Sequence, residues 1–160
     1  MVDINLKELN KFLLDANANG YAGDGNKVKP PQRPGFDEIE YCKGNWLFHD
    51  SYAGHYFAPG QEIVYYKNQP VWAMAYAGGM KFQYHEDDKF AKETFSFLKK
   101  ALLAMNSKKP FRGPEKFEES DWKYQSKVTG DTMDFSGNER IYYKNKLVFE
   151  QNFIGGIVVN

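Results

Sequence analysis

The sequence predicts an α+β fold made of two tandem copies of one unit, a helix followed by three antiparallel strands, related by a pseudo-two-fold axis. Three observations predict it. The stretch YYKNQPVWAMAYAGG at 65–79 recurs as YYKNKLVFEQNFIGG at 142–156. A helical pattern precedes each copy, and residues alternate with period two inside the strands. We therefore expect one domain over residues 1–160, with repeats at 1–80 and 81–160.

The repeat is longer than its two quoted segments. Gly60–Gly79 aligned with Gly137–Gly156 gives nine identities in twenty positions. With a gap of one residue in the alignment, Trp46 also aligns with Trp122. Two hairpins could converge on common turn residues, but the matches include strand residues as well. Duplication is therefore the favoured interpretation.

Each repeat opens with a helix. In the first, Asn5 and Glu8 form a capping-box pattern and Gly20 ends the helix. In the second, Asp87 or Asp88 provides the cap, and Asn106 and Pro110 stop the helix. The apolar faces are Leu6, Leu9, Phe12, Leu13 and Ala16 in the first helix, and Phe90, Phe97, Leu98, Ala101, Leu102 and Met105 in the second.

Three strands follow each helix. They are expected at Trp46–Tyr52, Gln61–Lys67 and Val71–Tyr76, and at Trp122–Val128, Glu139–Lys144 and Leu147–Phe153. Tight turns are expected at Asn68-Gln69 and Asn145-Lys146. Short connections make consecutive strands antiparallel. The two sheets could join edge to edge, or face each other with the helices outside, and either arrangement predicts a cleft at the seam between repeats.

The alternation assigns the faces of the strands. In WKYQSKV, the residues Lys123, Gln125 and Lys127 must be solvated, so their neighbours face inward. Transferred along the repeat, this predicts inward sets of Trp46, Phe48, Asp50, Tyr52, Glu62, Val64 and Tyr66, and of Trp122, Tyr124, Ser126, Val128, Glu139, Ile141 and Tyr143. Three carboxyl groups thus lie on an otherwise aromatic and apolar face.

A buried carboxylate without a partner costs several kcal/mol, so a partner is expected for each of these groups. The candidates are tyrosine hydroxyls, backbone amides, an arginine such as Arg33 or Arg112, or a cationic ligand. A purely structural interpretation has each glutamate bonding its neighbours at the start of its strand. The functional interpretation is a pocket with aromatic walls and an acidic floor, suited to a flat or cationic small molecule.

Composition excludes several other classes of function. The formal net charge is zero and basic residues are scattered, which disfavours direct nucleic-acid or membrane binding. Cys42 is the only cysteine, so a disulfide within the chain and a cysteine-based zinc site are excluded. The glycine-rich Gly20–Lys27 follows a helix, unlike a phosphate loop, and is interpreted as a surface loop that could cover the seam. We expect no metal and no other cofactor, and a cytoplasmic location.

The motifs resemble those of a family. The motifs concerned are FLLDANANGYAG, Arg33–Gly35, WLFHDSYAG, GQEIVYY, PVWAMAYAGG, FRGPEKFEESDWKY and YYKNKLVFEQNFIGG. Through them the chain resembles, over nearly its whole length, an uncharacterised bacterial domain of unknown function. Members of that family occur alone or behind a helix-turn-helix of the xenobiotic-response-element (XRE) class, which implies a sensory partner of regulators. Ala75 departs from the pattern, where a polar residue is expected. In architecture alone, the chain also resembles gyrase-inhibitor-like effector-binding domains, which have an aromatic, acidic cleft at a similar seam.

The leading prediction is a non-catalytic, small-molecule-binding sensor module, acting as a monomer or homodimer, with its pocket at the seam. Its candidate ligand-binding residues are Trp46, Asp50, Tyr52, Glu62, Tyr65, Tyr66, Trp72, Tyr76 and Glu139. One alternative is an enzyme that uses Asp50 and Glu62 as paired carboxylates on a small substrate. The other is a protein-interaction module without a pocket, which would expose a continuous apolar patch.

Overall fold

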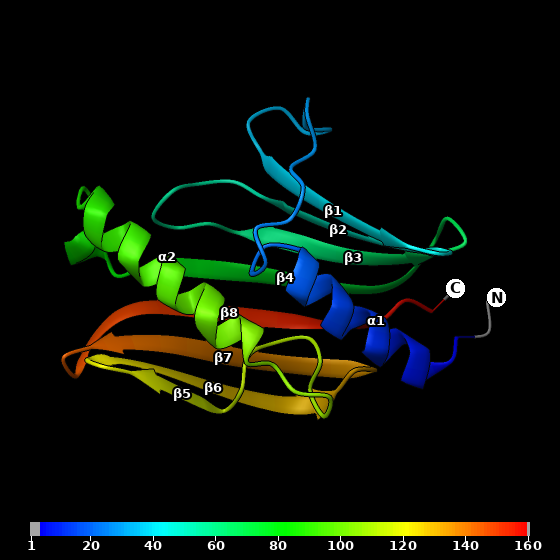
Figure 1. Ribbon diagram of the computed structural model, residues 1–160. Coiled ribbons are helices and arrows are strands. Elements are labelled where there is room, and N and C mark those ends of the chain that lie inside the picture. The colour runs from blue at the N-terminus through cyan, green and yellow to red at the C-terminus, as the bar shows by residue number, and fades with distance from the viewer. Residues whose placement is uncertain (1–3, 160) are drawn as a thin grey trace.

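The computed structural model describes residues 4–159 and has two layers (Figure 1). Eight strands form one antiparallel sheet in the order β1-β2-β3-β4-β8-β7-β6-β5. Two long helices, α1 and α2, cover one face of this sheet. The predicted α+β class is therefore confirmed, and of the two expected arrangements the structure has the edge-to-edge one.

Both helices begin where their caps predict. In α1 (Leu6–Asn19), the Asn5 side chain accepts hydrogen bonds from the backbone amides of Lys7 and Glu8. In α2 (Asp88–Leu103), the Asp87 side chain accepts from the amide of Phe90 at 3.0 Å. Of the two predicted caps, Asp87 is the one used. The buried faces are Leu9, Phe12, Leu13 and Ala16 in α1, and Ala91, Thr94, Phe97, Leu98, Ala101 and Leu102 in α2.

The prediction of three strands per repeat is wrong, because each helix is followed by four. The strands are β1 (Asp37–Lys43), β2 (Trp46–Tyr52), β3 (Gly60–Tyr66), β4 (Gln69–Met80), β5 (Lys116–Glu119), β6 (Trp122–Asp131), β7 (Asp134–Tyr143) and β8 (Lys146–Ile157). The two missed strands, β1 and β5, are the edges of the sheet. Their sequences, DEIEYCK and KFEE, are rich in charge, as is common for edge strands. A short 3₁₀ turn, η1 (Phe82–Tyr84), precedes α2.

The two hairpins that end each half are built alike. Lys67 and Asn68 both have positive φ, as do Lys144 and Asn145, which is the signature of a two-residue type I′ turn. Each turn lies one residue earlier than predicted. The ladders of the two hairpins also carry irregularities 77 positions apart, after Val64 and after Ile141.

The centre of the sheet is the β4–β8 ladder. It pairs Trp72 with Ile157 at one end and Met80 with Phe149 at the other, and Tyr76 lies opposite Phe153 in the middle. β4 and β8 are distant in the chain, whereas all the remaining neighbours in the sheet are consecutive strands. This single ladder therefore joins the first half of the sheet to the second.

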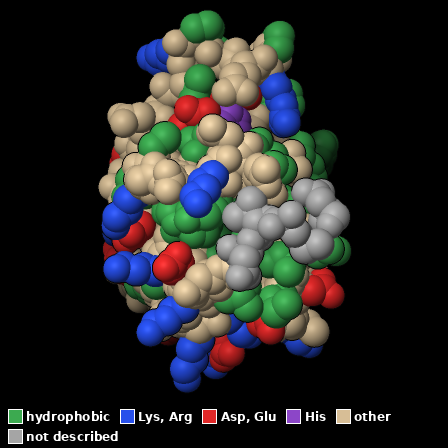
Figure 2. Space-filling model, turned by 90° about the vertical axis from the view of Figure 1, so that its right-hand side faces the viewer, with side chains coloured by type: hydrophobic (Ala, Val, Ile, Leu, Met, Phe, Trp, Pro, Cys, Tyr) green, Lys and Arg blue, Asp and Glu red, His purple; other side chains and the backbone are tan. Residues whose placement is uncertain are grey.

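The helix-covered face is the one that the alternation marked as inward. Phe48, Val64, Tyr124 and Ile141 are buried there. At the end of the molecule turned toward the viewer in Figure 2, basic and acidic side chains are interspersed over the surface. Within residues 4–159, no helix combines the length and the apolar character needed to cross a membrane.

Candidate functional site

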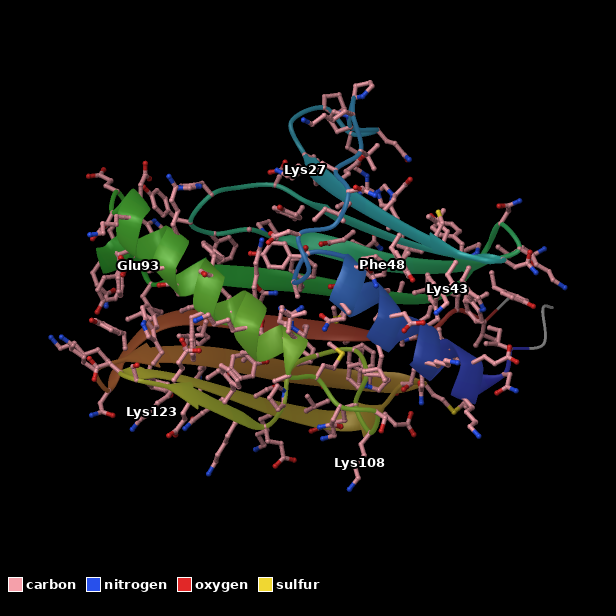
Figure 3. All side chains as sticks on the ribbon, in the orientation of Figure 1. Lys27, Lys43, Phe48, Glu93, Lys108 and Lys123 are labelled. Carbon is pink, nitrogen blue, oxygen red and sulfur yellow. The ribbon has the colours of Figure 1, made fainter. Side chains whose placement is uncertain are left out.

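A cavity of about 530 Å³ lies between the helices and the sheet. Residues of β2, β3 and β4 form its floor, and the facing sides of α1 and α2 contribute its walls. Phe48, labelled in Figure 3, lies on β2 beside α1 and is part of this lining. Segments 21–24, 54–58 and 105–112 also line it. The volume falls in the range typical of small-molecule sites.

The floor of the cavity carries two carboxyl groups. Asp50 on β2 and Glu62 on β3 are directly opposite each other in the antiparallel register. Residues in such positions have Cβ atoms about 4.5–5.5 Å apart, so the two acids are close neighbours. Asp50 is buried, and the Glu62 side chain is 16% exposed.

The third carboxyl, Glu139 on β7, is completely buried and is held by Arg112. The Arg112 Nε donates to Glu139 Oε2 at 2.9 Å, and Nη2 donates to the other carboxylate oxygen, Oε1. The Tyr124 hydroxyl also donates to Oε2, at 2.7 Å. Of the candidate partners for this charge, an arginine and a tyrosine hydroxyl are therefore the ones used, and the bidentate geometry is the strong form of this interaction.

The guanidinium of Arg112 lies close to the centre of the sheet. Its Cζ is 5.7 Å from the centre of the Tyr76 ring and 5.6 Å from that of Phe153, the two residues that face each other across the β4–β8 ladder. Its Nη1 is 3.7 Å from Glu62 Oε1, an ion pair beyond hydrogen-bonding distance. The other arginine considered, Arg33, contacts Ser51 instead.

The two acids of the floor differ in their partners. The Tyr76 hydroxyl donates to Asp50 Oδ1 at 2.7 Å. Burial raises the pKa of Asp50 to about 6, although the Tyr76 hydrogen bond and the charge of Arg112 oppose this rise. For Glu62, no group among residues 4–159 donates a hydrogen bond to the carboxyl. Burial and the nearby Asp50 carboxylate raise its pKa to about 8, against the opposing charge of Arg112. Near neutral pH the pair therefore holds one proton between two carboxyls.

Four of the predicted site residues line the cavity: Asp50, Tyr52, Glu62 and Tyr76. Burial raises the pKa of the Tyr52 hydroxyl to about 12, so it is a neutral donor at physiological pH. Glu139 lies behind Arg112 and positions it. We call the group Asp50, Glu62, Tyr76, Arg112 and Glu139 the acidic floor.

The remaining predicted residues lie elsewhere. Trp46 stacks on Phe12 of α1 and packs at a tilt against Tyr66. Trp72 is completely buried in the core and donates from Nε1 to the Thr132 carbonyl at 3.1 Å. Tyr65 is paired with Leu47, and neither tyrosine of the Tyr65-Tyr66 pair lines the cavity. The aromatic surface next to the acids comes instead from Phe48, Tyr52, Tyr76 and residues outside the strands.

Several lining residues were not in the predicted set. Arg112 was considered only as a possible counter-charge, and it lies in the loop after α2. Tyr21 belongs to the glycine-rich segment after α1, and burial raises the pKa of its hydroxyl well above the usual value. The ammonium of Lys99 on α2 lies 4.8 Å from the centre of the Tyr21 ring and pairs with Asp24. The sequence signal that pointed to Arg112 was the need of the inward carboxyl groups for a partner.

A second set of contacts holds the segment between β2 and β3. His55 Nε2 lies 3.1 Å from Asp88 Oδ1 at the start of α2, and the Tyr56 hydroxyl donates to the same oxygen. Tyr56 is stacked on His85. Over residues 4–159, no group of three or more His, Cys, Asp or Glu side chains is arranged to hold a metal ion.

The fold and the cavity together define a two-layer α+β protein with an acidic, aromatic pocket between its layers. The chain belongs to the family described as a domain of unknown function (DUF5680), whose model matches residues 50–158. This match contains the acidic floor and all of α2. Neither the curated proteins nor the solved structures contain a match to this chain.

Proposed function

We propose that the chain is a non-catalytic module that binds a small molecule bearing a cationic group and a flat apolar body. The observation that carries this proposal is the Glu62 carboxyl, which faces a cavity and receives no hydrogen bond from residues 4–159. Asp50 has Tyr76, and Glu139 has Arg112 and Tyr124. Because a buried carboxylate needs a partner, a ligand donor is the group that suits Glu62 best.

The walls support the apolar part of the proposed ligand. Phe48, Phe95 and Tyr76 border the same cavity as Glu62, together with the aliphatic Leu13 and Leu102. Aromatic faces attract cations and stack with flat rings. Such a lining with a few converging polar groups is typical of small-molecule sites.

We further propose that the fold arose by tandem duplication and has pseudo-two-fold symmetry. Supporting this, both halves follow the order helix then four strands, and their terminal hairpins have the same turns and irregularities 77 positions apart. Tyr76 and Phe153, also 77 positions apart, face each other in the central ladder. The acidic floor then lies on the symmetry axis, where both halves contribute side chains.

The proposed biological role is that of a sensor. The resemblance to domains found behind XRE-type helix-turn-helix regulators in bacteria favours a partner of transcription regulation. In that role, occupancy of the cavity is the signal that the module would pass to a regulator.

An enzyme is the second candidate, and one observation favours it. Asp50 and Glu62 are adjacent, and their pKa values are raised to about 6 and about 8, so near neutral pH one acid and one base lie side by side. Binding without chemistry remains the first proposal because the Asp50 carboxylate is already engaged by Tyr76.

Native mass spectrometry of freshly purified protein tests the proposal. We expect a co-purified small molecule on the unaltered chain, and much less of it on Glu62→Gln. Glu93→Gln is the matched control, because Glu93 is an exposed residue of α2 outside the cavity (Figure 3). Equal loading of Glu62→Gln and the unaltered chain with a cationic ligand would remove Glu62 from the site. Conversion of the captured compound during incubation would favour the enzyme.

A further inference from the structure

The two glutamates of the acidic floor occupy equivalent places in the sheet. Glu62 lies two residues after Gly60, which pairs with Tyr76, and Glu139 lies two residues after Gly137, which pairs with Phe153. A Cβ atom added to Gly60 would lie 2.4 Å from the Tyr76 ring, and one added to Gly137 would lie 2.4 Å from the Phe153 ring. Each glycine therefore lets a central aromatic ring lie next to the glutamate of its own half.

One of the two places is already occupied by a group of this chain. Glu139 binds the Arg112 guanidinium through two parallel hydrogen bonds, and aromatic rings of both halves flank that group. The site thus displays the chemistry that a carboxylate in this position accepts: a planar cation that presents two N–H groups side by side.

The other place has the same acceptor, and nothing within the described residues 4–159 donates a hydrogen bond to it. The cross-strand neighbour of Glu139 is Ser126, whereas that of Glu62 is Asp50, so the open place is the more acidic of the two. Near neutral pH, where Asp50 and Glu62 share one proton, the acidic floor has two negative charges against the single positive charge of Arg112. A monovalent cationic ligand is therefore favoured even though Arg112 Nη1 lies 3.7 Å from Glu62.

From this equivalence we propose that Glu62 binds a guanidinium or amidinium group, with the apolar body of the ligand in the cavity beside Phe48 and Tyr76. This inference rests on the proposed small-molecule function and names its ligand class. A primary ammonium offers the same charge as a point, without the planar pair of donors that matches the two carboxylate oxygens. The geometry of Glu62 therefore selects shape as well as charge.

The test compares three compounds that share one ring: benzamidine, benzylamine and the neutral benzamide. Isothermal titration calorimetry on the unaltered chain at pH 7 gives their affinities, so the comparison does not depend on the folding of any variant. We expect benzamidine to bind about 10-fold more tightly than benzylamine, because only the planar amidinium donates to both Glu62 carboxylate oxygens at once, and tenfold corresponds to about 1.4 kcal/mol, the order of one further hydrogen bond to a charged group. Benzamide should show no measurable binding.

Variants then locate the discrimination. Glu62→Gln should remove the preference for benzamidine, and Glu93→Gln should keep it. Benzylamine binding as tightly as benzamidine through Glu62 would overturn this inference and leave the cation-binding function standing. Failure of both cations to bind a protein that also carries no co-purified ligand would overturn the inference and the proposed function together.

Discussion

Replacing Arg112 with methionine is expected to destabilise the fold strongly, because it leaves the Glu139 carboxylate buried without its cation. Glu139 is completely buried and loses two charge-assisted hydrogen bonds, keeping only the one from Tyr124. Removing one partner of a buried ion pair costs about 3–5 kcal/mol. For a chain of this size, each kcal/mol lowers the melting temperature by about 2–4 °C, so a fall of roughly 6–20 °C is expected.

Urea unfolding at pH 7, followed by circular dichroism, measures this loss in the free energy of unfolding. Arg140→Met is the matched control, because Arg140 pairs with Glu150 at the surface, where an ion pair contributes about 0–1 kcal/mol. The double variant Arg112→Met with Glu139→Gln removes both charges and keeps an acceptor for Tyr124, so it should recover most of the loss. A single variant that loses less than about 1 kcal/mol, or a double variant as unstable as the single one, would refute the reasoning.

Three further predictions concern pH, close packing and capping. Burial raises the pKa of Glu62 to about 8, so its neutral form contributes stability that is present at acidic pH and lost as pH rises through about 8. The free energy of unfolding of Glu62→Gln should therefore rise relative to that of the unaltered chain between pH 5 and 9, by about 1.4 kcal/mol per unit of pKa shift. A difference in urea unfolding that does not change with pH would contradict this. Gly60→Ala and Gly137→Ala should each cost about 1–3 kcal/mol in the same assay, but only Gly60→Ala displaces Tyr76 from the cavity and should weaken ligand binding in calorimetry. Asn5→Ala should cost about 1 kcal/mol by scanning calorimetry, and an unchanged melting temperature would show that this cap is dispensable.

Local signals predicted most of the fold. Asn5 and Asp87 mark the helix starts because a cap acts on amides within three residues of itself. The hairpins were predictable for the same reason, since their turns connect adjacent strands. The edge strands were missed because charged residues dominate DEIEYCK and the short KFEE, although β1 does alternate acidic and apolar residues from Glu38 to Tyr41. Each edge strand is joined to its neighbour by a two-residue turn, Gly44-Asn45 before β2 and Ser120-Asp121 before β6.

The candidate site was predictable only in part. Alternation places Asp50 and Glu62 on the covered face, because it depends on strand geometry alone. It could not separate them from Trp46 and Trp72, which share that face. Whether a residue on it borders the cavity or packs in the core depends on where the helices cross the sheet. The pairing of Arg112 with Glu139 likewise depends on the path of the loop after α2.

The central β4–β8 ladder has a consequence for how chains of this protein can associate. It joins residues about 70 to 85 positions apart, whereas all other ladders of the sheet connect consecutive strands. Contacts so distant in sequence form late in folding, after the local hairpins. Until they form, each half presents a bare strand edge that matches the edge of the opposite half, in its own chain or in another molecule. Exchange of halves between two molecules is thus the misassembly to which this architecture is most exposed.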